Sequence, residues 1–277
     1  MTQTSLDPRK LIFPRTASHL GRAVCVSPQN SAFDYLSYGR TRLDATVARA
    51  GFETGRQETA LLCMGGRCRV TVDGNSHDID LYDGIYVPPG ATVEVTTDSE
   101  VDLVECSAEV SGSYPVQVVR YPDVVKNPSQ KFRSGGPSTS RDLNIIIGQN
   151  VRAGRLLAGF TRSVPGNWTS WPPHEHTNTL EELYVYFDMP PPAFGIQMVY
   201  TNPDEPEFVT VVRDGDAVLM PAGFHPNVAA PGHSINFIWM MAARREVEDR
   251  QFGVVNVQAG FDQAGSGLEA SRVGAQR

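Results

Sequence analysis

Residues 166–187 read GNWTSWPPHEHTNTLEELYVYF, and the rest of the chain is best interpreted outward from this stretch. Two histidines, His174 and His176, are separated by one residue, so they share one face of an extended strand. Two adjacent glutamates, Glu181 and Glu182, follow them, and an aromatic strand pattern runs on directly. The stretch therefore combines a pair of imidazoles with a carboxylate on a β-rich background.

A third histidine, His225, stands later in the segment PAGFHP. Pro221 and Gly223 predict a tight turn that delivers this histidine at the end of a strand. Three imidazoles and one carboxylate suit a divalent transition metal such as Zn, Mn, Fe or Ni, and either glutamate of the pair could supply the carboxylate. Open positions on such a metal would serve Lewis-acid chemistry on a sugar carbonyl or hydroxyl.

The composition favours short strands and excludes some partners. The chain of 277 residues is long enough for one large β domain or two moderate ones, and its 25 glycines and 20 prolines favour turns over long helices. A net charge of −7 without a basic cluster argues against nucleic acid. No apolar run approaches the ~18 residues of a membrane span, and the N-terminus lacks the apolar core of a signal peptide. We therefore expect no membrane partner, a cytoplasmic location and reduced cysteines.

The chain divides into two similar halves. A polar segment rich in Pro, Gly and Ser at residues 121–142 is the best linker candidate. The sequence DLYDGIYVPPGATVEV at residues 80–95 is echoed by RDGDAVLMPAGFHPNV at residues 213–228. The first copy lacks both the HxH pair and the later histidine, so the second copy is expected to carry the chemistry. The predicted divisions are an N-terminal domain without metal ligands, a metal-binding C-terminal domain and a tail, at residues 1–135, 136–260 and 261–277.

This ordered set of motifs resembles that of the cupin superfamily. More narrowly, WTSWPPHEH, EELYVYF, FGIQMVY and PAGFHPNVAAPG resemble the bicupin 5-deoxy-glucuronate isomerases of myo-inositol catabolism, and a related group acts on 5-keto-4-deoxyuronate in pectin breakdown. The resemblance is strong over residues 141–245 and holds in outline over the first half. Two spacings depart from the usual cupin pattern: more residues separate Gly166 from His174, and fewer separate PAG from His225.

The resemblance implies an all-β fold of two cupin, jelly-roll-like β-barrels, a bicupin, with the metal inside the second barrel. The implied metal ligands are His174, His176, Glu182 and His225. Glu182 is preferred to Glu181 because the cupin ligand directly precedes the apolar-aromatic strand, which here covers residues 183–187.

The resemblance also implies a reaction, the metal-dependent conversion of 5-deoxy-glucuronate to 5-dehydro-2-deoxy-gluconate by an intramolecular aldose–ketose isomerase. A proton beside a carbonyl is only weakly acidic, so such an enzyme must stabilise an ene-diolate and place a base. The candidates for proton transfer are Tyr184, Glu181 and Tyr200. The candidates for substrate binding are Arg162 and Arg141, which could meet the carboxylate, and Tyr186.

Three alternatives keep the fold and change the function. They are an isomerase of a related deoxy-uronate, an Fe(II) dioxygenase, and a cupin that binds a sugar acid without turning it over. Cupins host many chemistries, so the substrate rests on the family resemblance and not on spacing or composition. We expect a small-molecule sugar acid as the partner. The sequence also allows a homo-oligomer.

Overall fold

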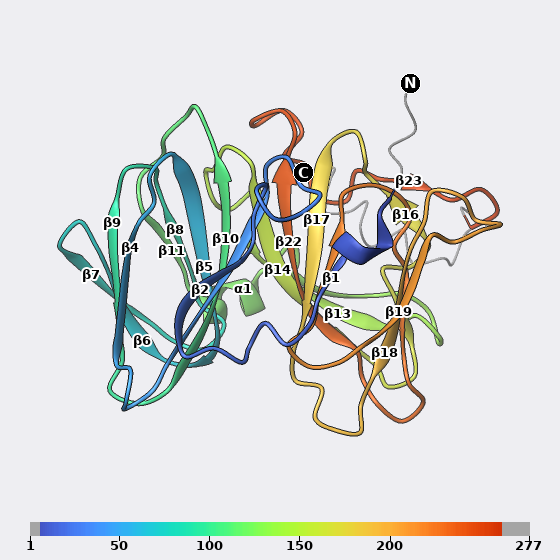
Figure 1. Cartoon of the computed structure of the whole chain (residues 1–277), viewed down its shortest axis with the longest axis horizontal. Coiled ribbons are helices and arrows are strands. Elements are labelled where there is room, and N and C mark those ends of the chain that lie inside the picture. Colours follow the sequence, from blue (N-terminus) through green and yellow to red (C-terminus); the bar gives the residue numbers. More distant parts are fainter. Residues whose placement is uncertain (1–5, 262–277) are drawn as a thin grey trace.

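A computed structural model describes residues 6–261 of the chain and consists almost wholly of β-strands. Within that range the strands are interrupted by a single turn of 3-10 helix, η1 (Pro8–Lys10), and one short α-helix, α1 (Tyr121–Lys126). The strands form layered sheets, as Figure 1 shows. The all-β prediction is confirmed.

The first half of the chain forms two sheets around one core. The six-stranded sheet, in the order β11-β8-β5-β10-β3-β2, contains β2 (Gly21–Val26), β3 (Ser37–Leu43), β5 (Gln57–Gly66), β8 (Gly84–Val87), β10 (Val101–Glu109) and β11 (Gln117–Val119). The four-stranded sheet, in the order β4-β9-β6-β7, contains β4 (Arg49–Glu53), β6 (Cys68–Val72), β7 (Asn75–Ile79) and β9 (Thr92–Thr96). Leu61, Val70, Val93 and Leu103 are among the buried side chains that both sheets contribute.

The second half repeats this arrangement. Its seven-stranded sheet, in the order β1-β20-β17-β22-β14-β13-β12, contains β1 (Ile12–Phe13), β12 (Lys131–Ser134), β13 (Arg141–Ile147), β14 (Leu156–Ser163), β17 (Leu180–Tyr186), β20 (Ala217–Met220) and β22 (Asn236–Ala243). Its four-stranded sheet, in the order β15-β21-β18-β19, contains β15 (Trp168–Thr169), β18 (Gly195–Val199), β19 (Phe208–Val212) and β21 (Asn227–Ala229). A two-stranded ribbon pairs β16 (His174–Glu175) with β23 (Asn256–Val257).

The two halves share one strand order. The run β8-β5-β10-β3 in the first half corresponds to β20-β17-β22-β14 in the second, and the echoed sequences supply β8 with β9 and β20 with β21. Two strands bear on the predicted boundary: β12 precedes residue 136 yet pairs with β13, and β1 pairs with β20 of the second half. The division at residue 135 stays a prediction, and residues 262–277 of the predicted tail lie outside the described part.

The two larger sheets lie back to back in the middle of the molecule (Figure 1). Successive side chains of β5 point to opposite faces of its sheet, so this strand contributes to two cores. Leu61 and Cys63 pack in the core of the first half, and Ala60 and Leu62 pack against the second half. The core of the second half is therefore continuous with the junction between the halves.

Two buried glutamates, one from each half, make equivalent hydrogen bonds across this junction. Glu58 on β5 accepts hydrogen bonds from the backbone N–H groups of residues 154–156, at 2.7, 2.6 and 3.0 Å. Glu181 occupies the corresponding place on β17 and accepts hydrogen bonds from the N–H groups of residues 34–36, at 2.8, 3.0 and 3.1 Å. Each glutamate thus holds the segment that enters β14 or β3 of the other half. A carboxyl group that accepts three backbone N–H bonds leaves none of these donors without a partner.

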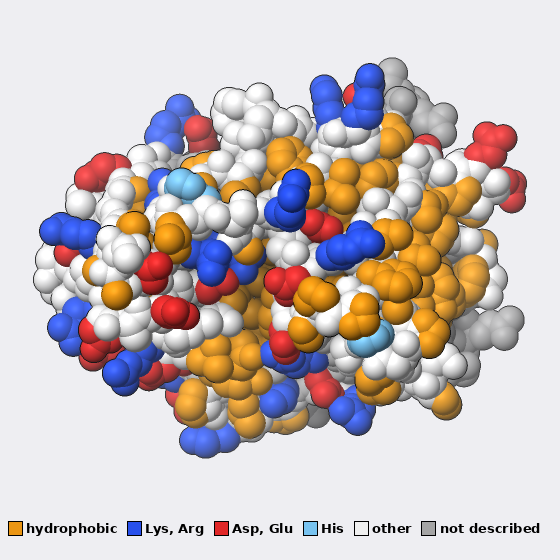
Figure 2. Space-filling model, turned by 60° about the horizontal axis from the view of Figure 1, so that its bottom comes forward, with side chains coloured by type: hydrophobic (Ala, Val, Ile, Leu, Met, Phe, Trp, Pro, Cys, Tyr) orange, Lys and Arg blue, Asp and Glu red, His pale blue; other side chains and the backbone are white. Residues whose placement is uncertain are grey.

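The two outer sheets differ in the surface they expose. Ile196, Val209 and Val211 are exposed on β18 and β19, whereas the first half exposes Arg49 and Arg69 on its outer strands. Figure 2 shows hydrophobic side chains gathered over the second half. The expected homo-oligomer stays a prediction. Among residues 6–261, no helix has the length and apolar character to cross a membrane.

Candidate metal centre

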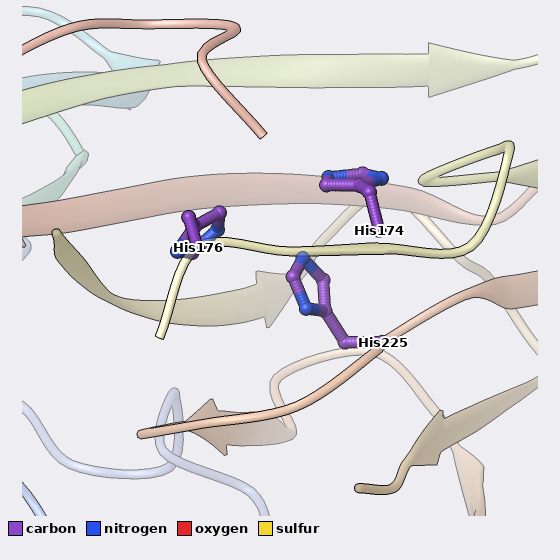
Figure 3. A group of neighbouring side chains, drawn as sticks. All are labelled: His174, His176 and His225. Atoms are coloured by element: carbon purple, nitrogen blue, oxygen red, sulfur yellow. The ribbon is translucent and has the colours of Figure 1, made fainter. Parts of the chain in front are cut away.

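The three histidines converge from two distant segments. His174 lies on β16 and His176 just beyond it, while His225 follows the turn after β20. Figure 3 shows His225 reaching toward the segment that carries the other two. Gly223 makes this turn possible, because its φ is +89° and a Cβ there would collide with the carbonyl oxygen of Tyr200. The side-chain nitrogens that could bind a metal all lie within 4.8 Å of one another.

Backbone carbonyls set the tautomer of all three rings. The Nδ1 atoms of His174, His176 and His225 lie 2.8, 3.1 and 2.9 Å from the carbonyl oxygens of Pro172, Leu180 and Gly223. A carbonyl oxygen can only accept, so each Nδ1 carries a proton, and a ring that is neutral keeps its lone pair on Nε2. This is the arrangement by which proteins orient histidine ligands toward a metal.

Glu182 faces the same point. Its Oε2 lies 2.9 Å from Nε2 of His176 and 3.1 Å from Nε2 of His225. Burial raises the pKa of Glu182, but the two histidines lower it more strongly, to about 2, so the carboxylate is ionised at neutral pH. Glu182 thus lies beside two of the three imidazoles, and His174 completes the group of histidines.

The donor set fits a metal cation. Nε2 of His225 is buried without a hydrogen-bond partner among the described residues, although the carboxylate of Glu182 is close. A carboxylate oxygen and an imidazole lone pair repel one another unless a proton or a metal cation lies between them. Burial lowers the pKa of His176, but the contact with Glu182 raises it by more, which reflects the same demand for positive charge. Burial, followed by the neighbouring His225 and His176, lowers the pKa of His174 to about 3, so this ring is neutral at neutral pH. The histidine triad can therefore bind a metal.

A cavity opens beside the cluster. The empty space at this place, counted together with the adjoining open solvent, amounts to about 720 Å³. Its walls include His174, His176 and Glu182 together with Arg141, Ser170, Trp171, Tyr184, Phe237, Trp239, Met241 and Phe252. Phe252, Gly253 and Val255 come from the segment that leads to β23, whose pairing with β16 holds it over the site.

Two further predicted residues reach this cavity. Arg141 on β13 lines the wall and is buried, and its guanidinium donates to the carbonyl oxygens of Thr139 and Trp171 at 2.9 and 2.7 Å. It forms no ion pair with a carboxylate within residues 6–261. Burial lowers the pKa of Arg141 to about 10, so the guanidinium stays charged at neutral pH. Tyr184 on β17 places its hydroxyl 2.7 Å from that of Ser170.

Four predicted residues do not line the cavity. Glu181 is adjacent to Glu182 on a strand, so its side chain faces the opposite side. There its carboxyl group accepts hydrogen bonds from the N–H groups of residues 34–36. Arg162 donates to Asp188 and to the hydroxyl of Tyr82, both at 2.6 Å, on the face of β14 opposite the cavity-lining Thr161. The hydroxyls of Tyr186 and Tyr200 are hydrogen-bonded instead to Gln197 and Gln258, at 2.6 and 2.7 Å.

The sequence interpretation missed several wall residues. Phe237, Trp239 and Met241 alternate along β22, and this period-two pattern is a signal that could have marked them as facing one side. Ser170 precedes the HEH segment, and a lone serine between two tryptophan-containing stretches gives no signal of its own. No local pattern indicates that Phe252 returns over the site.

Comparison with solved structures supports the fold. An IolB-like protein from Salmonella typhimurium LT2 superposes with a TM-score of 0.79 at 23% identity, covering 90% of this chain and 96% of that chain. Oxalate decarboxylase from Bacillus subtilis superposes with a TM-score of 0.61 at 13% identity, covering 83% and 76%. At these identities the likeness concerns the fold, which is cupin-like as the sequence predicted.

Sequence comparison gives the family. A 5-deoxy-glucuronate isomerase from Geobacillus kaustophilus (strain HTA426) is 27% identical over 251 residues, which cover 84% of this chain and 89% of that protein. Residues 11–255 match the KduI/IolB family, and this span includes every residue of the metal cluster. The chain therefore belongs to the KduI/IolB family.

Proposed function

We propose that this protein is a metal-dependent aldose–ketose isomerase that converts 5-deoxy-glucuronate to 5-dehydro-2-deoxy-gluconate. One observation supports the proposal most strongly. The cavity beside the histidine cluster also contains Arg141, a buried arginine that has no carboxylate partner among the described residues. Family membership and the named activity of the Geobacillus relative support the reaction type. We also propose that the protein acts in the cytoplasm and in inositol catabolism.

The metal would be held by His174, His176, Glu182 and His225. When bound, a divalent ion such as Zn, Mn, Fe or Ni would act as a Lewis acid on oxygens of the substrate at the reacting carbons. The protein contributes fixed histidine tautomers and an ionised carboxylate, so the ligands need no rearrangement.

Tyr184 is the side chain best placed to handle a proton at the substrate. Its hydroxyl lies in the cavity wall beside Ser170, and burial raises its pKa well above the usual range. A phenol of raised pKa is protonated at neutral pH, so it donates a hydrogen bond to a substrate oxygen on which charge develops. Ser170 holds the hydroxyl in position.

Arg141 would bind the carboxylate of the substrate. Among residues 6–261 its buried guanidinium donates to carbonyl oxygens only, and a carboxylate would supply the missing countercharge. Arg141→Gln is expected to raise KM roughly 100-fold, because losing one partner of a buried charge pair costs about 2–5 kcal/mol. Bound metal and kcat should change little. Steady-state kinetics with 5-deoxy-glucuronate, beside metal analysis, measures both.

Arg162→Gln is the matched control for this prediction. Its guanidinium is bonded to Asp188 and Tyr82 outside the cavity, so KM should stay within about twofold of the wild type. The assignment of the carboxylate to Arg141 fails if the Arg162 variant, and not the Arg141 variant, raises KM.

The reaction is tested by incubating the purified protein with 5-deoxy-glucuronate and following the products by NMR under anaerobic conditions. An isomerase forms the ketose without oxygen and without a redox cofactor. Product formation that requires oxygen and iron would favour a dioxygenase. Tight binding without turnover would favour a sugar-acid-binding protein, and turnover of another deoxy-uronate alone would change the substrate.

A further inference from the structure

One buried donor in the cavity wall has no partner. Trp239 on β22 lines the cavity and is only 2% exposed, and its indole Nε1 makes no hydrogen bond among the described residues. Native proteins pair nearly all buried N–H groups, because an unmet donor loses its hydration without compensation. A donor left unmet in the wall of a binding cavity is therefore a candidate for a ligand contact.

Two contacts confine the indole. Gly159 on β14 pairs with Trp239 across the sheet, and a Cβ at this glycine would overlap the six-membered part of the indole ring. The ring of Phe252 also contacts it, with its centroid 5.0 Å away and tilted by 31°. A side chain confined in this way presents its N–H in one orientation, which favours a directional contact over a general apolar wall.

The position of Trp239 in the sheet places it near the groups already assigned. Trp239 pairs with Tyr184 of β17, and the same cavity contains Arg141 and the metal cluster. On the proposed function, these groups take the carboxylate at one end of the sugar acid and the reacting carbons at the other. The hydroxyls on the carbons between them still need hydrogen-bond partners.

We propose that the indole N–H of Trp239 donates a hydrogen bond to a hydroxyl oxygen on the middle carbons of the bound sugar acid. This inference rests on the proposed function and extends it to substrate recognition. An indole N–H can donate but not accept, so it pairs with an oxygen and is left unmet beside a methylene. Trp239 thereby discriminates among deoxy sugar acids by the position of the missing oxygen.

The test removes the donor without changing the shape of the side chain. Trp239 is replaced with β-(benzothien-3-yl)alanine, in which sulfur takes the place of the N–H, and Trp239→Phe is made as a second variant. Both are expected to raise KM for 5-deoxy-glucuronate roughly tenfold with kcat within about twofold, because the contact is made away from the reacting carbons. Metal content and thermal unfolding should be unchanged for the benzothienyl protein.

The same replacement at Trp168 is the control, since this residue lies on β15 and does not line the cavity. An unchanged KM in the benzothienyl protein overturns the inference, even if Trp239→Phe is impaired, because only the phenylalanine variant also alters packing. A wild-type protein that does not isomerise the sugar would refute the proposed function instead. The contact would then be judged from calorimetric binding of 5-deoxy-glucuronate, where a tenfold weaker Kd supports it and an equal Kd overturns it.

Discussion

Replacement of His176 by alanine is expected to remove the bound metal and to lower turnover of 5-deoxy-glucuronate by about a thousandfold or more. The ring is buried and its Nε2 lies 2.9 Å from Glu182, so its loss removes one of the three imidazoles that could hold the metal. Loss of a Lewis acid removes several kcal/mol of transition-state stabilisation, and each 1.36 kcal/mol is about tenfold in rate. Metal analysis and single-turnover rates on the same sample measure both effects.

His77→Ala is the control for this prediction. His77 lies on β7 in the outer sheet of the first half, far in the fold from β16, so metal content and rate should match the wild type. A His176→Ala protein that keeps its metal and its rate would show that the cluster is not the site.

Replacement of Glu181 by alanine is expected to destabilise the protein by about 3–5 kcal/mol, because each buried N–H group left unsatisfied costs about 1–3 kcal/mol. Glu181 is fully buried, and its loss leaves the N–H groups of residues 34–36 without an acceptor. Glu58→Ala should have a similar effect, since residues 154–156 lose the same kind of partner. Thermal unfolding should shift by about 10 °C in each case.

The exposed Glu100 offers a control, because Glu100→Ala removes a charge without a buried partner and should leave the unfolding temperature within about 1 °C. Glu181→Gln separates stability from catalysis. It keeps one acceptor oxygen, so folded protein should retain kcat within about twofold. A loss of kcat of about 100-fold or more, with metal and stability intact, would contradict a structural role and return Glu181 to the reacting groups.

The sequence was informative wherever its pattern was local. Spacing alone placed His174 and His176 on one face, and the Pro-Gly turn before His225 predicted how this ring is delivered. The echo between the halves anticipated their common strand order, because β8 and β20 begin with the same kind of turn. These features depend on residues within a few positions of one another.

The sequence could not settle what depends on contacts between distant segments. Glu181 and Glu182 are adjacent, and only the packing of the other half against β17 shows which faces the junction. Arg141 and Arg162 were equal candidates for the same reason, since the pairing of β13 with β14 decides which guanidinium faces the cavity. The return of Phe252 over the site has no local signal at all.

Isomerisation is expected to depend on a metal ion bound by the histidine cluster. The most direct measurement strips the protein with a chelator, returns a divalent metal in steps, and follows conversion of 5-deoxy-glucuronate by NMR without oxygen. We predict no conversion in the stripped protein and a rate that rises in proportion to bound metal until one ion per chain is reached. Full activity in the metal-free protein would contradict the claim.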